Sequence, residues 1–221
     1  MKSKILSIIL VGVSTFTFAQ SNMNLGIRAG VLSAGMRGDA VNNLSNLLDF
    51  SQGMVTPVNR TGFFAGAYTN IPVSENLFVE PAIYYAQKGY ELRGALNLKG
   101  LSFLGINAKA QLQSQYIDIP VLLKYNMGGI QLFAGPQVSY LMQADLRTTA
   151  GVLGFNVIDK KIDATNQFNR WDAGITAGVG FNLSNNINIM ASYDYGLTKV
   201  DANRNTSAYN NAIKLGIGFK F

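Results

Sequence analysis

The feature that most constrains the fold of this chain is a repeated alternation of apolar and polar residues. Eight such stretches lie between Asn24 and Phe221, and the face formed by every second residue carries no charge. An alternation with a period of two belongs to a β-strand with two different faces. Stretches of about ten residues with one uncharged face are typical of strands that cross a membrane in a closed β-barrel.

The segments that join these stretches alternate in length. Long polar segments are separated by short turns at Pro72–Asn76, Asn126–Gly129 and Ser184–Asn186. Outer-membrane barrels have short turns on the periplasmic side and long loops outside the cell. The sequence therefore predicts an all-β fold, an eight-stranded antiparallel up-and-down transmembrane β-barrel with both termini on the periplasmic side.

Composition excludes several classes of function. The chain has no cysteine and no histidine, so it lacks disulfides, thiol chemistry, and the commonest general base and metal ligand. We therefore expect no enzyme, no metal site and no cofactor. The sequence has no basic run with interleaved aromatic residues, so we expect no nucleic-acid partner.

The first residues have the pattern of a targeting segment. Lys2 and Lys4 precede the apolar run Ile5–Val13, and Thr17–Ala19 offers small residues before a cleavage point. The apolar run is shorter than the ~20 residues that a membrane-spanning helix needs. We interpret residues 1–19 as a signal peptide and residues 20–221 as one barrel domain. The expected destination is the bacterial outer membrane, with lipid around the barrel.

Charged residues recur on the predicted inner face. A barrel of eight strands is just wide enough for side chains to fill it, and buried charges must be paired. We predict a structural charge network in the lumen, although a narrow conducting pore is an alternative. A catalytic carboxylate pair is disfavoured because no base or metal ligand accompanies it. The predicted network comprises Arg28, Glu80, Lys88, Asp118, Lys124, Arg170, Asp172, Asp194 and Lys214.

Three stretches are similar to a known family. Phe78–Gly89, Tyr116–Tyr125 and Phe133–Pro136 resemble the third, fourth and fifth strands of the PorT-like outer-membrane β-barrel family. The resemblance implies an eight-stranded outer-membrane barrel without a shared catalytic site. The namesake of that family assists protein secretion across the outer membrane, and we do not transfer this role to the chain.

The same stretches contain Pro81, Pro120 and Pro136 inside predicted strands. Proline removes a donor from the hydrogen-bond ladder, and a closed barrel has no edge on which to place it. We therefore expect local bulges at these prolines, which would shift the inward and outward phase beyond them.

Three further segments suggest partners. The ending Phe219–Phe221 resembles the terminal aromatic signal that outer-membrane barrels present to their insertion machinery. Val41, Leu44, Leu47 and Leu48 have helical spacing, which predicts a helix that caps the barrel or binds a partner. The alternation continues through Leu96 and again from Ile106, so the third and fourth strands are expected to project as an exposed hairpin whose edge accepts a strand from a protein partner.

These observations favour a non-enzymatic integral barrel with a structural role or a role in interactions made by its loops. The first alternative is a small pore or an accessory barrel for transport or protein secretion across the outer membrane. A soluble ligand-binding barrel of lipocalin type would bury apolar residues inside, which is the opposite of the observed pattern. An enzyme that acts on lipid would need an arrangement of Ser, Asp or Lys that we do not find in the sequence.

Overall fold

The computed structural model describes residues 24–38, 55–96, 106–152, 155–202 and 207–221. The predicted signal peptide and the predicted helix around Val41–Leu48 lie outside these residues. Among the described residues, no helix is long and apolar enough to cross a lipid bilayer. The elements are β1 (Asn24–Arg37), β2 (Val55–Pro72), β3 (Leu77–Leu96), β4 (Ile106–Met127), β5 (Ile130–Val152), β6 (Phe155–Asp163), the 3-10 helix η3 (Thr165–Gln167), β7 (Trp171–Asn182), β8 (Ile187–Lys199) and β9 (Tyr209–Lys220).

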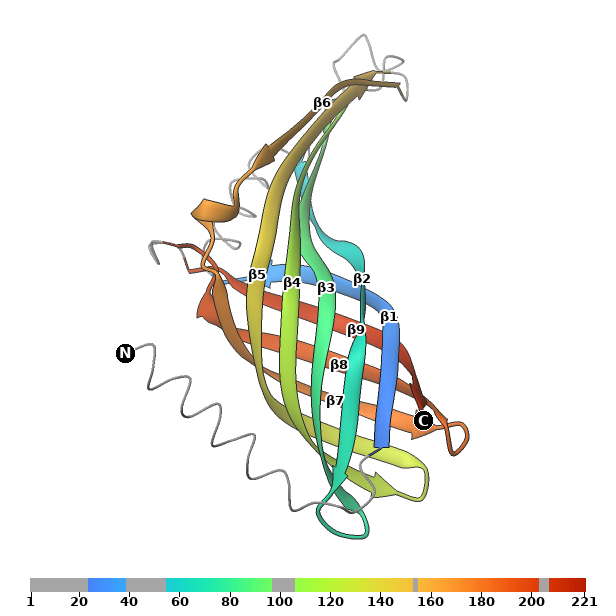
Figure 1. The fold of residues 1–221 in the computed structure, drawn as a ribbon. Coiled ribbons are helices and arrows are strands. Elements are labelled where there is room, and N and C mark those ends of the chain that lie inside the picture. The colour runs from blue at the N-terminus through green and yellow to red at the C-terminus, as the bar shows by residue number, and fades with distance from the viewer. Residues whose placement is uncertain (1–23, 39–54, 97–105, 153–154, 203–206) are drawn as a thin grey trace, which may run out of the picture.

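Eight of these strands form a closed antiparallel ring (Figure 1). The ring runs β1-β2-β3-β4-β5-β7-β8-β9 and closes where β1 pairs with β9, from Gly26 opposite Lys220 to Arg37 opposite Tyr209. The predicted eight-stranded all-β barrel is therefore confirmed. Because every strand of the ring has a neighbour on each side, the ring has no free edge at the level of the barrel.

The ninth strand, β6, is not part of the ring. It pairs only with the outer half of β5, from Asp145 opposite Asp163 to Val152 opposite Phe155. The sequence predicts a long polar segment from about Gln143 to Gln167 between two strands of the ring, and this prediction was wrong because most of that segment is strand. Beyond Tyr140, β5 leaves its ring neighbour β7, and β6 supplies a hydrogen-bonding partner on that side.

The two faces of each strand differ as the alternation predicts. On β9, Ile213, Leu215 and Ile217 are each more than half exposed on the outer face, whereas Lys214 between them is 3% exposed in the interior. The same phase holds on β1, where Ile27 is 52% exposed and Arg28 is 3% exposed. The barrel is thus apolar outside and polar inside, the reverse of a soluble barrel.

The prolines do not interrupt the ladders. Pro81 lies opposite Val121, Pro120 opposite Gln137 and Pro136 opposite Ile175, and the register is the same on both sides of each pair. The expected bulges at these residues were a wrong prediction. Proline removes one donor but leaves the number of residues between neighbouring pairs unchanged, so register is preserved.

The register shifts lie nearer the outer end of the barrel. One falls in β2 between Asn59 and Phe64, and another lies where Gln115 and Tyr116 face Gln143 and Leu141. A bulge bends its strand and increases the local twist. These shifts therefore lie where strands β2 to β5 leave the ring and continue outward (Figure 1).

The short turns mark the opposite end of the barrel. Between β4 and β5, Gly128 and Gly129 have φ angles of +56° and +105°. Two consecutive positive φ angles fit the tight hairpin turns whose twist matches that of the strands, and glycine adopts them without strain. Both termini of the ring lie at this end, where the backbone N–H of Phe221 donates to the carbonyl oxygen of Leu25 at 2.9 Å.

Candidate functional site

The layer of the lumen nearest the short turns is built around Glu80. This carboxylate is fully buried and accepts from Arg28 at 2.6 Å. Its second oxygen forms an ion pair with Lys124. Arg28 also donates to the Tyr84 hydroxyl at 2.7 Å, and its guanidinium lies 4.1 Å from the centre of the Tyr68 ring. Two cations therefore share one carboxylate in this layer.

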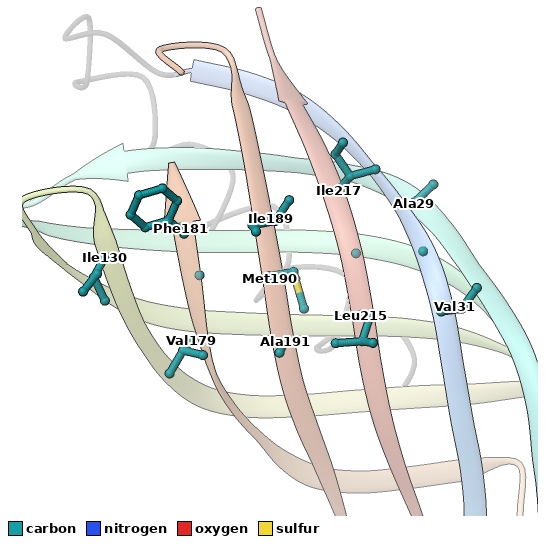
Figure 2. A pocket seen from close by; sticks show the side chains of 13 residues that line it. Ala29, Val31, Ile130, Val179, Phe181, Ile189, Met190, Ala191, Leu215 and Ile217 are labelled. Carbon is teal, nitrogen blue, oxygen red and sulfur yellow. The ribbon is translucent and has the colours of Figure 1, made fainter. Parts of the chain in front are cut away.

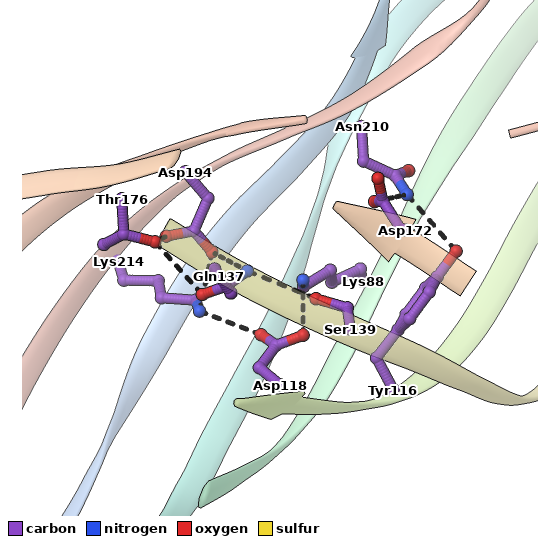
Figure 3. Close-up of polar contacts among 10 residues, drawn as sticks. All are labelled: Lys88, Tyr116, Asp118, Gln137, Ser139, Asp172, Thr176, Asp194, Asn210 and Lys214. Atoms are coloured by element: carbon purple, nitrogen blue, oxygen red, sulfur yellow. Dashed lines mark hydrogen bonds and ion pairs between the residues drawn. The ribbon is translucent and has the colours of Figure 1, made fainter. Parts of the chain in front are cut away.

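The middle layer joins two carboxylates to two lysines (Figure 3). Asp118 binds Lys88 at 2.7 Å through one oxygen and Lys214 at 2.9 Å through the other. Lys214 also binds Asp194 at 2.6 Å. All four side chains are at most 8% exposed. The chain of contacts crosses the barrel from β3 and β4 to β8 and β9, so it links strands that are not neighbours in the ring.

Asp172 lies farther outward and has a different kind of partner. Its carboxylate accepts from the amide of Asn210 at 2.8 Å, and Asn210 also approaches the Tyr116 hydroxyl at 3.2 Å (Figure 3). No salt bridge links Asp172 to a cation in the described part of the chain.

Arg170 stands apart from the predicted network. It precedes β7, and its guanidinium donates to the backbone carbonyl oxygens of Leu141 and Met142 at 3.3 and 3.1 Å. The strand begins one residue later, at Trp171, so the inward phase that predicted Arg170 does not extend to it. When Arg170 is left out, the predicted network has equal numbers of cations and carboxylates in the lumen. The cations are Arg28, Lys88, Lys124 and Lys214, and the carboxylates are Glu80, Asp118, Asp172 and Asp194.

Neutral side chains missing from the predicted network supply further hydrogen bonds to it, although Arg28 Nε and Asp172 Oδ1 have no hydrogen-bond partner among the described residues. Thr176 donates to Asp194 at 2.9 Å, and Gln137 approaches the other oxygen of Asp194 at 3.5 Å. Asn188 joins the inner layer by donating to Tyr68 at 2.9 Å. These residues occupy inward positions on the predicted strands. Their place in the lumen could therefore have been predicted from the strand phase, but not from charge.

Side chains fill the middle layers of the lumen. Phe64 and Tyr84 form an edge-to-face pair with ring centres 5.5 Å apart, and both are buried. The cavity lined by Lys88, Gln137, Asp172 and Asp194 has a volume of about 10 Å³, which is the space of roughly one water molecule. Such an interior holds the wall together through side-chain contacts and, among the described residues, leaves little space at this level.

The outer face carries a hollow of about 680 Å³ (Figure 2). It is shallow and apolar, and it extends over β7, β8, β9 and β1. Ala29 and Ala191 form its low points between larger neighbours such as Leu215 and Phe181. With exposed aliphatic side chains on this surface, the hollow belongs to the face that meets lipid tails.

Aromatic residues mark the outer limit of that apolar face. Tyr140 and Trp171 lie opposite each other on β5 and β7 with ring centres 5.0 Å apart. Ile117 pairs with Tyr140 on one side and with Tyr85 across β3 on the other, so a row of these residues crosses neighbouring strands. Rings at this level fit the interfacial girdle of a membrane barrel.

Beyond this row the same sheet continues outward, and we call this extension the outer sheet. It consists of Val55–Asn59 of β2, Gly89–Leu96 of β3, Ile106–Gln115 of β4, Gln143–Val152 of β5 and all of β6. From Tyr140 to Val152, β5 alone extends about 40 Å at ~3.3 Å per residue. Figure 1 shows the sheet standing out from one side of the barrel.

The outer sheet corrects the prediction of a free β3–β4 hairpin. The two strands do project and pair as far as Leu96 opposite Ile106. Their outer edges, however, are taken by β2 and β5, so neither offers a place for a partner strand. Within the described residues, the edges of the outer sheet are β2 and β6.

Cross-strand ion pairs hold the outer sheet. Lys109 forms an ion pair with Glu91 at 3.0 Å, and Lys161 forms one with Asp145 at 3.0 Å. A third ion pair joins Arg147 to Asp159, and both of these side chains are exposed. The hydrogen bonds from Arg147 hold the pKa of Asp159 below its usual range. Charges of both signs on β6 are a common way of keeping an exposed edge from pairing nonspecifically.

Several solved structures are similar to this fold. Ail, the attachment invasion locus protein of Yersinia pestis, matches at 14% identity over 91% of this chain and 100% of that chain, with a TM-score of 0.47. Neisserial surface protein A matches at 12% identity over 91% and 100% of the two chains, with a TM-score of 0.45. The outer membrane protein OprG from Pseudomonas aeruginosa matches at 14% over 90% and 95%, with a TM-score of 0.39. No curated protein matches the sequence.

The closed ring, the apolar outer face and the polar lumen define a small integral β-barrel of the bacterial outer membrane. The model of the outer membrane protein beta-barrel domain family matches residues 18–202 of the sequence. The chain belongs to this family, and lipid surrounds its barrel.

Proposed function

We propose that this protein is a non-enzymatic outer-membrane barrel that acts through its outer sheet and not by conduction. The observation that carries the proposal is the continuation of β2 to β5 beyond the aromatic row, with β6 added to them. A barrel that served only to occupy the membrane would not need this extension. The proposed partner is a protein that contacts the outer sheet or the outer loops from outside the cell.

The lumen supports the part of the proposal that excludes conduction. Ion pairs and aromatic rings occupy its middle layers, and a cavity of about 10 Å³ remains there. Purified barrel refolded in a planar bilayer is therefore expected to insert without steady current steps. Steps that disappear in a lumen variant such as Asp118→Asn would instead favour the alternative, a small pore or an accessory barrel for transport or secretion.

The outer sheet is tested by removing it while leaving the ring. A variant that lacks residues 93–109 and 147–161, each replaced by a short Gly-Ser turn, keeps the ring pairs from Tyr85 opposite Ile117 to Tyr140 opposite Trp171. We expect this barrel to fold and insert, yet to lose the surface proteins that cross-linking on intact cells attaches to the full-length barrel. Unchanged cross-linked products in the trimmed barrel would contradict a role of the outer sheet.

The targeting steps belong to the same proposal. Residues 1–19 would be removed as a signal peptide, which leaves residues 20–221 as the barrel domain. The final strand, ending at Phe221, would present its aromatic signal to the insertion machinery. The resemblance of Phe78–Gly89 and Tyr116–Tyr125 to the PorT-like family supports the outer-membrane destination. Mass spectrometry of the protein from outer membranes should find Gln20 as its first residue.

A further inference from the structure

A polar pocket opens at the end of the barrel that carries the short turns. Its volume is about 400 Å³, and we call it the periplasmic vestibule. Carboxamide side chains from separate strands line it, among them Asn24, Asn70, Asn126, Asn182 and Asn188. The buried ion pairs of Glu80 close its inner side, because Lys124 lines the vestibule and Asn188 contacts Arg28 at 3.4 Å.

Hydrogen-bonding capacity in the vestibule is only partly used. Gln131 and Asn182 satisfy each other at 3.0 Å, and Asn188 is held by Tyr68. By contrast, the side-chain oxygens of Asn70 and Asn126 are buried and have no hydrogen-bond partner. A buried polar atom without a partner is unfavourable, so each of these carboxamides would gain by turning toward a ligand whose hydroxyl or amide group pairs with it.

The vestibule is also positively charged. Among the described residues, its lining includes Lys124 and Lys220 and no Asp or Glu side chain. Lys124 shares Glu80 with Arg28, which leaves one cation in excess behind the carboxamides. No salt bridge joins Lys220 to an acid among the residues that the structure describes. Phe78 adds one apolar surface to this lining.

We propose that the periplasmic vestibule binds an acidic sugar. A carboxylate would meet the excess positive charge, ring hydroxyls and an acetamido group would pair with the carboxamides, and the apolar face of the ring would pack on Phe78. The volume accommodates one or two sugar rings. The source of such a sugar at this face is either cell-wall glycan whose muramic-acid carboxylates carry no peptide, or a free acidic sugar in the periplasm.

The test measures binding of two matched sugars to the full-length barrel. The protein is refolded in amine-oxide micelles, since detergents with sugar headgroups would compete. N-Acetylmuramic acid carries the carboxylate, and N-acetylglucosamine has a similar ring without it. We expect the acid to bind about tenfold more tightly, as one charge-assisted contact is worth about that factor.

Three variants separate the parts of the site. Lys220→Gln should remove most of the preference for the acid, while the double variant Asn70→Ala, Asn126→Ala should weaken both sugars about tenfold. Asn211→Ala, at the opposite end of the barrel, is the matched control and should bind like wild type. Heat-modifiable electrophoretic mobility verifies that each variant is folded.

Each result has a defined meaning. Equal affinity for the two sugars, or no binding at millimolar concentration, would overturn the proposal, and so would an equal loss in Asn211→Ala. If cell-wall sacculi stripped of their peptides by an amidase retain the wild-type barrel and N-acetylmuramic acid displaces it, the ligand is the peptide-free cell-wall glycan. If the soluble acid binds but sacculi do not retain the barrel, the ligand is a free acidic sugar.

Discussion

Replacing Asp118 by asparagine tests whether the lumen charges stabilise the barrel. Asp118 is fully buried and binds Lys88 at 2.7 Å and Lys214 at 2.9 Å. Asparagine keeps the shape of the side chain but removes its charge. Lys214 would still have Asp194 at 2.6 Å, whereas Lys88 would lose its ion pair while remaining 4% exposed. Leaving one member of a buried pair uncompensated costs about 3–5 kcal/mol, so the unfolding free energy should fall by that amount.

A second substitution makes the argument specific. In the variant Asp118→Asn, Lys88→Met, the stranded charge is gone and the pair between Lys214 and Asp194 remains. Most of the lost stability should return, leaving a deficit of about 1–2 kcal/mol from imperfect packing. The coupling energy between Asp118 and Lys88 should therefore be at least about 1 kcal/mol.

The assay is reversible urea unfolding in lipid vesicles, followed by the fluorescence of the single tryptophan, Trp171. Asp159→Asn is the control, because it removes an exposed carboxylate from the outer sheet and should leave the midpoint unchanged. Two results would refute the reasoning. One is an Asp118→Asn barrel as stable as wild type, and the other is a double variant no more stable than Asp118→Asn.

Three other perturbations address the wall, the orientation and the outer sheet. Gly135→Ala places a Cβ 2.0 Å from the carbonyl oxygen of Val121 and should prevent the heat-resistant folded form seen in electrophoresis, whereas Gly128→Ala, with no atom within 4 Å, should retain it. Since the chain has no cysteine, Lys160→Cys should react with a membrane-impermeant maleimide on intact cells and Asn185→Cys should not; the reverse labelling would mean the opposite orientation. Hydrogen bonds from the hydroxyl and backbone N–H of Thr165 hold the pKa of Asp163 below its usual range. This contact is therefore complete above the usual pKa of about 3.9 and is lost as pH falls through the lowered value. An NMR titration of the Thr165 amide that has its midpoint above the usual value would contradict this.

The ring could be predicted because a period of two is a direct consequence of strand geometry. Ile213 to Ile217 alternate with Lys214 and Gly216 in the sequence, and the same residues alternate between lipid face and lumen in the structure. The membrane strengthens this signal, since a charge on the outer face is costly. Strand phase therefore survives even where Pro81, Pro120 and Pro136 remove donors.

The outer sheet could not be predicted with the same rules. Beyond Tyr140 no lipid enforces an apolar face, so the sequence of β6 around Asp159–Lys161 is as polar as a loop. β6 pairs with the preceding strand β5, from Val152 opposite Phe155 to Asp145 opposite Asp163, but its own residues lack the apolar alternation that would mark it as a strand. The prediction that Arg170 belongs to the lumen network was wrong for a related reason, since the position at which a strand begins depends on its neighbouring strands.

The pairing of charges within the lumen network could likewise not be predicted from the sequence. Inward phase identifies which charges are inside, but pairing depends on the stagger between strands that lie across the barrel. Asp118 and Lys214 are 96 residues apart and meet only because the ring closes between β1 and β9. The position of each charged side chain along the barrel axis decides which acid forms an ion pair with which base.

That position gives the interior an uneven charge along its axis. Near the short turns, Arg28 and Lys124 face only Glu80, and farther outward Lys88 and Lys214 face Asp118, Asp194 and Asp172. The network is balanced as a whole but has an excess cation toward the periplasmic vestibule and an excess carboxylate toward the outer end. Because interactions in a poorly solvated interior are weakly screened, this separation makes the vestibule a favourable place for an anion. Neutralising Asp172 as Asp172→Asn, far from the vestibule, should therefore tighten the binding of N-acetylmuramic acid slightly, whereas Lys124→Met should weaken it.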